Sequence, residues 1–407
     1  MRGPSFWFDE ADPGLPIKFG PASNGEYAPE PLSPVLTTVI REARAECDRT
    51  ADRLGMDRRR FLKTAMAAAI TLFFLDRYTR LAAAGEPGDG FFGAGRLRSH
   101  REGDFLTSPE VSPLFGETLA RFVASERDRI GALDAVIDCG AGSGALLAGL
   151  MPGIAEVPAY AVEVSPAARE SIQIRVSGVV VVGALDEIPE RLRGVIIANE
   201  LVDNLPAAVA VRTDDGWEEG AVAIGGTGLE PVRAPIRPEV AAWAERNAPG
   251  LPPGARVEVQ LAAANWLRIA LDRLAAGAVV VIDYGDTSDG LRPRRAQGTI
   301  RTYRAHHLGP DPLLEPGATD ITMDVDFSAL SEVAEEAGAA VEYSSQSDFL
   351  ARWGLRDRLG EIRHAELEAA RAGRTMDRLV LRNQVTEAET LLHPRGLGDF
   401  RILVARK

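Results

Sequence analysis

Beyond residue 91 the chain alternates short apolar runs with stretches of helical character. The apolar runs consist of consecutive Val, Ile and Ala residues, without the polar alternation of a half-exposed strand, and lie at 135–138, 159–163, 179–182, 194–199 and 278–283. Such continuous runs are typical of strands that are covered on both faces, as in a parallel sheet. Helical stretches lie between them, for example at 145–151 and 167–176. The pattern therefore predicts an α/β fold with a mostly parallel sheet, helices on both faces and right-handed crossovers.

The C-terminal third carries a different pattern. Charged residues follow one side of two helical stretches, 330–342 and 348–371, and a short apolar run at 400–404 predicts the last strand. We expect these helices to cover the sheet or a cleft beside it.

Polar residues end most of the predicted strands. Asp138, Glu163, Asn199 and Asp283 each close an apolar run. Because ligands of parallel sheets bind beyond the carboxyl ends of the strands, these residues mark the predicted binding edge. The pair Asp283 and Tyr284 is a candidate lining of an acceptor pocket, although a polar strand end facing water would look the same.

The sharpest motif follows the first predicted strand, where residues 138–144 read Asp-Cys-Gly-Ala-Gly-Ser-Gly. Gly140, Gly142 and Gly144 permit a tight turn and a close approach of the backbone to a ligand. A helix then begins, and its unpaired N–H groups carry positive partial charge. Glu163, 19 residues after Gly144, ends the second strand and is placed to accept hydrogen bonds from a ribose.

Two cofactors compete for this loop, a dinucleotide and S-adenosylmethionine. The spacing of Gly140, Gly142 and Ala145 satisfies the dinucleotide pattern loosely. Asp138 would oppose a diphosphate and suits a cationic ligand better, so the loop favours S-adenosylmethionine.

Composition and charge narrow the class of partner. The 407 residues carry a net charge of −13, which disfavours a nucleic-acid backbone as partner because phosphate binding needs clustered Lys and Arg. The two cysteines exclude a disulfide framework. Of the five histidines, only His306 and His307 are close in sequence, and neighbours rarely chelate one ion, so we predict no metal site. Cys139 is interpreted as a small loop residue rather than a nucleophile.

Residues 1–85 form a separate N-terminal extension. Its first 34 residues are rich in Pro and Gly and are predicted to be loop or disorder, and a charged helical stretch follows at 36–54. Arg-Arg-Arg-Phe-Leu-Lys at 58–63, the apolar run 65–75 and three alanines at 82–84 resemble a twin-arginine leader. Eleven apolar residues are too few to span a bilayer, so we expect no stable membrane insertion. A helix packed on the catalytic domain and a leader-like piece fused to an enzyme are alternatives.

Further motifs point to one family. Residues 103–116 read Gly-Asp-Phe-Leu-Thr-Ser-Pro-Glu-Val-Ser-Pro-Leu-Phe-Gly, and 199–206 read Asn-Glu-Leu-Val-Asp-Asn-Leu-Pro. With the glycine loop and the closing His-Pro-Arg-Gly-Leu-Gly-Asp-Phe at 393–400, these resemble the MidA family of methyltransferases. The resemblance reaches from about residue 72 or 91 to the C-terminus. It implies that residues 86–407 form a Rossmann-like class I methyltransferase domain with insertions, which binds S-adenosylmethionine and transfers its methyl group.

The resemblance also implies roles for individual residues. In the mitochondrial relatives, which assist assembly of respiratory complex I, the implied acceptor is a protein arginine. Glu200 and Asp203 are the candidate catalytic carboxylates, and they would share a face if their turn is helical. The remaining predicted cofactor contacts, beyond Asp138, Glu163 and the three glycines, are Thr107, Ser108, Glu110 and Asn199. A cofactor contact for Glu200 and a cap or ion pair for Asp203 are the structural alternatives.

Three hypotheses about function follow. The favoured one is a methyltransferase acting on a protein side chain, with a basic protein segment as partner and the cytoplasm, where the methyl donor is made, as location. The second is an assembly or interaction factor that keeps the fold without turnover, and the third is an NAD(P)-dependent oxidoreductase. The sequence leaves the oligomeric state open.

Overall fold

The computed structural model describes residues 41, 45, 47–49, 51, 107–154, 156–224, 229–304, 307–309, 311–314 and 319–407. The chain divides into two units, Met1–Glu86 and Pro87–Lys407. The described residues of the first unit are helical, within the stretch 36–54 that was expected to be a helix. The leader-like segment 58–84 and the start of the motif at 103–106 lie outside the described residues. Among the residues that are described, no helix is long and apolar enough to cross a membrane.

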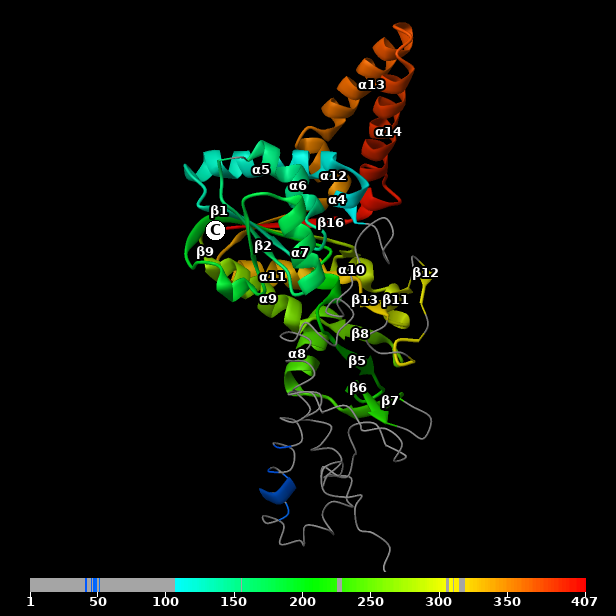
Figure 1. The fold of residues 1–407 in the computed structure, drawn as a ribbon. Coiled ribbons are helices and arrows are strands. Elements are labelled where there is room, and N and C mark those ends of the chain that lie inside the picture. The colour runs from blue at the N-terminus through cyan, green and yellow to red at the C-terminus, as the bar shows by residue number, and fades with distance from the viewer. Residues whose placement is uncertain are drawn as a thin grey trace, which may run out of the picture. The chain divides into compact units, whose positions relative to one another are not determined.

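The second unit is built on a seven-stranded sheet with the order β15-β16-β9-β4-β1-β2-β3 (Figure 1). The five strands from β9 to β3 are parallel, and β16 pairs antiparallel with both β9 and β15. The strands are β1 (Ala135–Cys139), β2 (Ala159–Val162), β3 (Val179–Val182), β4 (Leu192–Asn199), β9 (Leu274–Asp283), β15 (Ala340–Ser345) and β16 (Arg401–Arg406). The predicted α/β, Rossmann-like fold is confirmed.

Apolar cores fill both faces of the sheet. Val136 and Val195 belong to one core cluster, whereas Ala135, Ile137 and Ile196 belong to another, because successive strand residues point to opposite faces. Both faces of β1 and β4 are therefore buried, as the continuous runs predicted. At β3 the same prediction is wrong, since β3 is the edge strand of the sheet and Val180 is 50% exposed.

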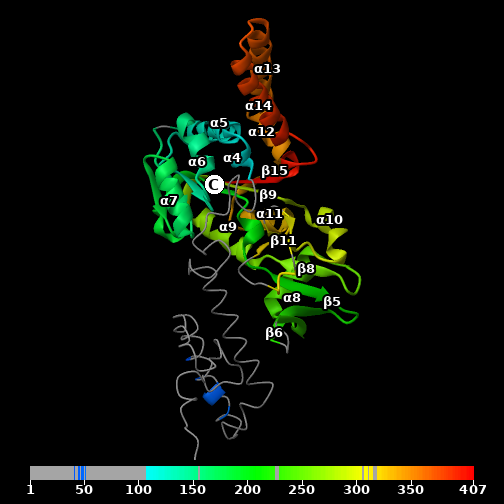
Figure 2. The ribbon, with the colours of Figure 1, turned by 45° about the vertical axis from the view of Figure 1, so that its right-hand side comes forward.

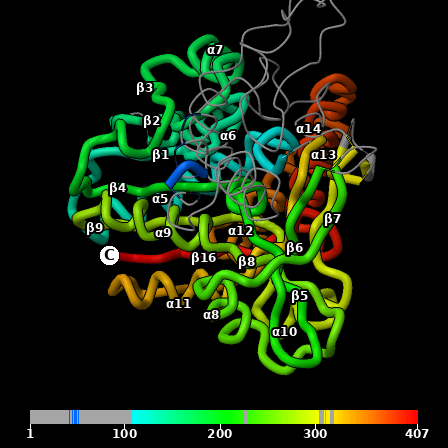
Figure 3. Tube along the Cα trace, turned by 90° about the horizontal axis from the view of Figure 1, so that it is seen from below, coloured from blue at the N-terminus to red at the C-terminus, as the bar shows by residue number. Residues whose placement is uncertain are grey.

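Helices cover the two faces. One core contains residues of α5 (Pro113–Ile130) and α6 (Ala145–Leu150), and the other contains residues of α9 (Leu261–Arg273) and α11 (Phe327–Glu336). Figure 3 shows α9 and α11 running alongside β9 and β16. A smaller core lies between β2 and α7 (Pro166–Arg175). The other short elements of this part are α4 (Ser108–Val111), η1 (Met151–Gly153), η2 (Leu185–Glu187) and η3 (Val202–Asn204).

An insertion between β4 and α9 forms a second, antiparallel sheet with the order β7-β6-β5-β8. It comprises β5 (Ala208–Arg212), β6 (Trp217–Ile224), β7 (Leu229–Pro235), α8 (Pro238–Asn247) and β8 (Arg256–Val259), and α8 packs on β5 and β8 through a core of its own. None of these strands was predicted from the sequence, although residues 208–211 of β5 form a continuous apolar run.

A third group of short elements follows β9. It comprises β10 (Gly285–Asp286), α10 (Ser288–Leu291), η4 (Arg294–Ala296), β11 (Arg301–Arg304), β12 (His307–Leu308), β13 (Asp320–Thr322) and β14 (Val325–Asp326). A buried ion pair anchors this region, with Nη2 of Arg295 2.5 Å from Oδ2 of Asp326. Arg295, in the arginine-rich stretch 292–304, therefore has a structural role.

The C-terminal helices depart from the prediction in two places. The helix predicted over 330–342 ends at Glu336, and residues 340–342 belong to β15. The stretch 348–371 contains two helices, α12 (Gln346–Arg352) and α13 (Leu355–Arg371), because Gly354 takes a left-handed conformation with φ of 89° between them. With α14 (Thr375–Leu391), α13 forms a hairpin that projects from the sheet (Figures 1 and 2). The turn η5 (Leu397–Asp399) then leads into β16.

Candidate cofactor and acceptor site

The glycine loop leaves β1 at the carboxyl edge of the sheet. Gly140 and Gly144 have φ of 72° and 78°, a region that side-chain-bearing residues rarely adopt. A Cβ on Gly140 would lie 3.1 Å from Cδ1 of Leu201, and one on Gly144 would lie 3.2 Å from Cγ1 of Ile172. The loop therefore needs glycine both for its backbone conformation and for its close packing on the turn after β4 and on α7.

Asp138 lies beneath this loop as an isolated buried carboxylate. Its side chain is 2% exposed, and Oδ2 has no hydrogen-bond partner among the described residues. Burial, and then the neighbouring charge of Glu163, raise the pKa of Asp138 to about 8. A buried, unpartnered acceptor of this kind calls for a donor or a cation from a ligand.

Glu163 joins the ends of β1 and β2. Its Oε2 accepts a hydrogen bond from the Gly142 N–H, and its Oε1 accepts one from the Ser165 N–H, both at 2.8 Å. Burial raises the pKa of Glu163, while these backbone donors act in the opposite direction. The residue thus shapes the glycine loop in addition to the ribose contact predicted for it, which stays a prediction, because each carboxylate oxygen can accept a further hydrogen bond.

The short helix α4 connects the glycine loop with the turn after β4. Ser143 Oγ donates to Glu110 Oε1 at 2.9 Å, and the Ser108 N–H donates to Glu200 Oε1 at 3.3 Å. The Thr107 N–H donates to Glu110 Oε2 at 3.4 Å. The predicted contacts Thr107, Ser108 and Glu110 are therefore brought to the same edge as the glycine loop.

Asn199 ends β4, and Glu200 follows it in an unusual conformation. Glu200 has φ of 52°, which is strained for a residue with a side chain and is often kept at functional sites. Asn199 Nδ2 donates to Glu200 Oε1 at 3.2 Å, whereas Asn199 Oδ1 has no partner among the described residues. Burial, followed by the charge of Asp203, raises the pKa of Glu200 to about 8.

Glu200 and Asp203 would share a face if their turn were helical, but the structure does not meet this condition. Only residues 202–204 form a 3₁₀ turn, and the left-handed Glu200 lies outside it. The two carboxylates are nevertheless close enough for the charge of Asp203 to raise the pKa of Glu200. A strained turn, rather than helical spacing, brings the two candidate catalytic residues together.

Asp203 is 1% exposed and is held by its neighbours. Asn204 Nδ2 donates to Asp203 Oδ1 at 2.9 Å, and the Tyr284 hydroxyl donates to Asp203 Oδ2. Burial raises the pKa of Tyr284 far above its ordinary value, so the hydroxyl keeps its proton and remains a donor. Burial also raises the pKa of Asp203.

Asp283, a candidate lining of the acceptor pocket, instead makes structural hydrogen bonds. Its side chain is fully buried, and Oδ2 accepts hydrogen bonds from the N–H groups of Val202 and Asp203 at 3.1 and 3.2 Å. It fixes the backbone of the turn that carries Asp203, rather than lining an acceptor pocket. Its partner Tyr284 does reach the site, through Asp203.

Two further contacts at this edge of the sheet were not predicted from the sequence. Gln346 shares a hydrogen bond with Ser108 Oγ at 3.4 Å across 238 residues of chain, and Arg175 Nη1 donates to Ser143 Oγ at 2.9 Å. Neither residue belongs to a recognisable motif, so the sequence held no signal for them.

Thiol and metal chemistry find no support here. The Cys139 thiol is buried, which raises its pKa well above the ordinary value and leaves it a poor nucleophile. Within the part of the chain that the structure describes, no group of three or more His, Cys, Asp or Glu residues is arranged to hold a metal ion.

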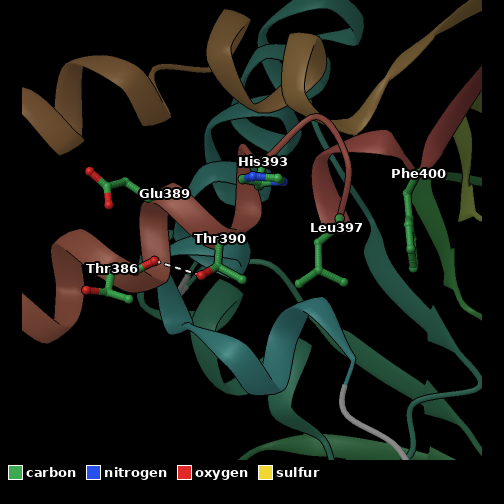
Figure 4. Close-up of a pocket in the computed structure, with 7 residues that line it drawn as sticks. Thr386, Glu389, Thr390, His393, Leu397 and Phe400 are labelled. Atoms are coloured by element: carbon green, nitrogen blue, oxygen red, sulfur yellow. Dashed lines mark hydrogen bonds between the residues drawn. The ribbon is translucent and has the colours of Figure 1, made fainter.

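A groove opens beside this edge, at the base of α14 (Figure 4). It has a volume of about 680 Å³ and is lined by Thr386, Glu389, Thr390, His393, Gly396, Leu397 and Phe400. The Phe400 ring contacts the Tyr284 ring edge-on, with 5.5 Å between centroids. The groove therefore adjoins the residues that surround Asp203.

Comparisons with known proteins agree with this geometry. A family model of S-adenosyl-L-methionine-dependent methyltransferases matches residues 118–345, more than half of the chain. The mitochondrial protein arginine methyltransferase NDUFAF7 of Xenopus tropicalis is 28% identical over 293 residues, which cover 63% of this chain and 66% of that relative. The match thus spans just under two thirds of the relative's length.

Solved structures extend the similarity over nearly the whole chain. A Burkholderia thailandensis protein with bound S-adenosyl-homocysteine has a TM-score of 0.70 and 28% identity, covering 94% of this chain and 95% of that one. A native structure from the same organism has a TM-score of 0.68 and 29% identity, with the same coverage.

The sheet, the glycine loop and the acids at the strand ends define a Rossmann-like, class I methyltransferase. The chain belongs to the family of S-adenosyl-L-methionine-dependent methyltransferases. The resemblance to MidA proteins and the choice of S-adenosylmethionine over a dinucleotide are thereby confirmed.

Proposed function

We propose that this protein transfers the methyl group of S-adenosylmethionine to an arginine side chain of another protein. The observation that carries this proposal is the pair of carboxylates Glu200 and Asp203. No Lys, Arg or His of the described residues forms an ion pair with either of them. Burial of carboxylates without a positive counter-charge is energetically unfavourable unless a cation binds to them or they become protonated. A guanidinium is a cation that suits them, and the named activity of the NDUFAF7 relatives supports the same acceptor.

The cofactor is proposed to lie across the tips of β1, β2 and β4. Gly140, Gly142 and Gly144 would let the cofactor approach the backbone of the loop closely. Glu163 would accept hydrogen bonds from the ribose of the cofactor. When bound, S-adenosylmethionine supplies an electrophilic methyl carbon on a sulfonium. The unpartnered oxygens of Asp138 and Asn199 are fitting acceptors for donors of a cationic ligand. Thr107, Ser108 and Glu110 would close the site from α4.

The acceptor arginine is proposed to lie between the cofactor and Asp203. Carboxylates bind guanidinium through charge-assisted, bidentate hydrogen bonds, which orient the attacking nitrogen. Asn204 Oδ1 and Thr322 Oγ1 are buried without partners among the described residues, and the Met323 N–H donates to the Asp203 carbonyl at 3.1 Å. Both acceptors belong to segments that contact Asp203, and they would add sites for guanidinium N–H groups. The methylated nitrogen must lose a proton, which Glu200 is suited to accept because of its raised pKa.

A second function is favoured by one observation. Both oxygens of Asp203 already accept hydrogen bonds, from Asn204 and from Tyr284, as those of a structural carboxylate would. An assembly factor that binds the cofactor without turnover would have this arrangement. It predicts binding of S-adenosyl-homocysteine without methyl incorporation into any protein.

Methyl transfer from tritium-labelled S-adenosylmethionine into bacterial lysate tests the proposal, if the labelled proteins are hydrolysed and their amino acids separated. We expect label in methylated arginine, reduced about 100-fold or more by Glu200→Gln, which keeps the size of the side chain but removes its charge. Asp214→Asn, an exposed acid of the insertion, is the matched control and should leave incorporation unchanged. Label in another amino acid, or none while S-adenosyl-homocysteine binds, would contradict the arginine acceptor.

We also propose a cytoplasmic location, because the methyl donor is made there. Cell fractionation with N-terminal sequencing of the recovered chain tests this. A periplasmic chain that lacks the leader-like segment would contradict it.

A further inference from the structure

The groove at the base of α14 (Figure 4) has two walls of different origin. Thr386, Glu389, Thr390 and His393 come from α14 and its C-terminal end, whereas Leu397 and Phe400 come from the turn that leads into β16. The first wall is polar and the second is apolar. A surface of this kind can bind a chain that carries both apolar and polar side chains.

Phe400 connects the groove with the candidate acceptor site. It directly precedes β16, whose first residue Arg401 pairs with Asp283 at the end of β9. Phe400 therefore lies at the same edge of the sheet as Tyr284, and the two rings are in contact. Since the Tyr284 hydroxyl donates to Asp203, only one side chain separates the groove wall from a proposed guanidinium ligand.

The helix α4 links the groove to the cofactor side of the site. Ser112, which follows α4, donates through Oγ to Oε2 of Glu387 on α14 at 2.8 Å. The same short helix carries Ser108 and Glu110, which contact Glu200 and the glycine loop. The groove and the proposed cofactor site thus share α4 as a common neighbour.

Size and charge favour one kind of occupant. A volume of about 680 Å³ is well above that of one side chain and lies within the range of pockets for ligands of several residues. The described lining residues include one acid, Glu389, which forms an exposed ion pair with Arg363 at 2.5 Å, and no Lys or Arg. The chain as a whole carries a net charge of −13. The absence of a cation from the lining and the net negative charge of the chain are compatible with a basic segment.

We propose that this groove binds the segment of the substrate protein that flanks the acceptor arginine, in an extended form with apolar and basic residues. The inference rests on the proposed function and adds to it a docking surface outside the catalytic site. Apolar side chains of the segment would pack on Leu397 and Phe400, and its basic residues would lie near Glu389. The arginine itself would pass Phe400 and Tyr284 to reach Asp203.

Binding of a synthetic peptide tests the docking surface without requiring turnover. The probe is a fluorescein-labelled dodecapeptide of leucine, lysine and glycine with one central arginine, measured by anisotropy with the full chain saturated by S-adenosyl-homocysteine. Thr386 is exposed, and Thr386→Arg would place a large, positively charged side chain in the groove, which would repel the positively charged peptide. We expect this change to weaken peptide binding about tenfold or more. Thr386→Glu should leave binding equal or tighter.

The control is Met376→Arg on the same helix. Met376 is 71% exposed and, ten residues before Thr386, lies about 15 Å further along α14. The Met376→Arg variant should bind the peptide with a dissociation constant within about twofold of that of the unchanged chain. Equal binding by Thr386→Arg and Met376→Arg would overturn the proposal, as would no peptide binding by the unchanged chain at about 1 mM. Unaltered melting temperature and S-adenosyl-homocysteine affinity of Thr386→Arg exclude misfolding as the cause of a loss.

The result separates the two proposals. Arginine methylation in lysate together with peptide binding that ignores the groove changes would overturn the docking surface alone. Peptide binding that depends on Thr386, without methyl transfer to any protein, would support the docking surface and contradict the proposed turnover.

Discussion

The carboxylate of Asp138 offers a sharp test of the electrostatics of the site, through the change Asp138→Asn. Burial and Glu163 raise the pKa of Asp138 from 3.8 to about 8. A raised pKa means that the folded chain holds the proton more tightly than the unfolded chain. The stability that this provides is complete below pH 4 and is lost as the pH rises towards 8. At about 1.4 kcal/mol for each pKa unit, ionised Asp138 destabilises the ligand-free protein by at most about 6 kcal/mol.

Asparagine has nearly the same shape and cannot ionise. At pH 5 we expect Asp138→Asn to raise the melting temperature only by about 3 °C, because Asp138 is still protonated in the folded chain but already ionised in most of the unfolded chain. At pH 9 the variant should melt higher than the unchanged chain, by up to about 12 °C at about 2 °C per kcal/mol. The assay is thermal unfolding without ligand at pH 5, 7 and 9, with the exposed Asp214→Asn as control. A difference between Asp138→Asn and the unchanged chain that stays constant with pH would refute the reasoning.

Two further changes test other parts of the account. Glu163→Gln removes the charge of the side chain that accepts hydrogen bonds from the Gly142 and Ser165 N–H groups, and it should weaken S-adenosyl-homocysteine binding about 10- to 100-fold in calorimetry. The control Glu170→Gln, which changes an exposed acid on α7, should leave the affinity unchanged. Equal affinities of the two variants would contradict the proposed ribose contact of Glu163. Arg295→Met leaves Asp326 as a buried, unpaired charge and should lower the free energy of unfolding, measured in urea, by about 3–5 kcal/mol. The control Arg127→Met breaks the exposed pair with Asp128 and should cost less than about 1 kcal/mol. Similar losses for the two variants would show that the buried pair stabilises the fold no more than the exposed pair.

The central sheet and the glycine loop could be predicted because their signals are local. Strands such as β1 and β4 are buried on both faces and therefore read as continuous apolar runs. The glycines at 140 and 144 are required by backbone conformation, so they also stand out in the sequence. The edge strand β3 shows the limit of this logic, because its four valines give the same pattern although Val180 is 50% exposed.

The remaining features depend on contacts between distant parts of the chain. Tyr284 reaches Asp203 across 81 residues, and Gln346 reaches Ser108 across 238. The spacing of Glu200 and Asp203 suggested a helix, but a left-handed residue brings them together instead. Neither long-range pairing nor backbone strain at a residue with a side chain leaves a periodic trace in a sequence, so these parts of the site required the structure.

The most direct test of the central claim is a crystal structure of this chain with S-adenosyl-homocysteine. The account predicts the nucleoside across the tips of β1, β2 and β4, with its ribose hydroxyls within about 3.2 Å of Glu163 and its thioether facing Glu200 and Asp203. A ligand bound elsewhere, or an empty edge occupied by the chain's own side chains at saturating ligand, would contradict it.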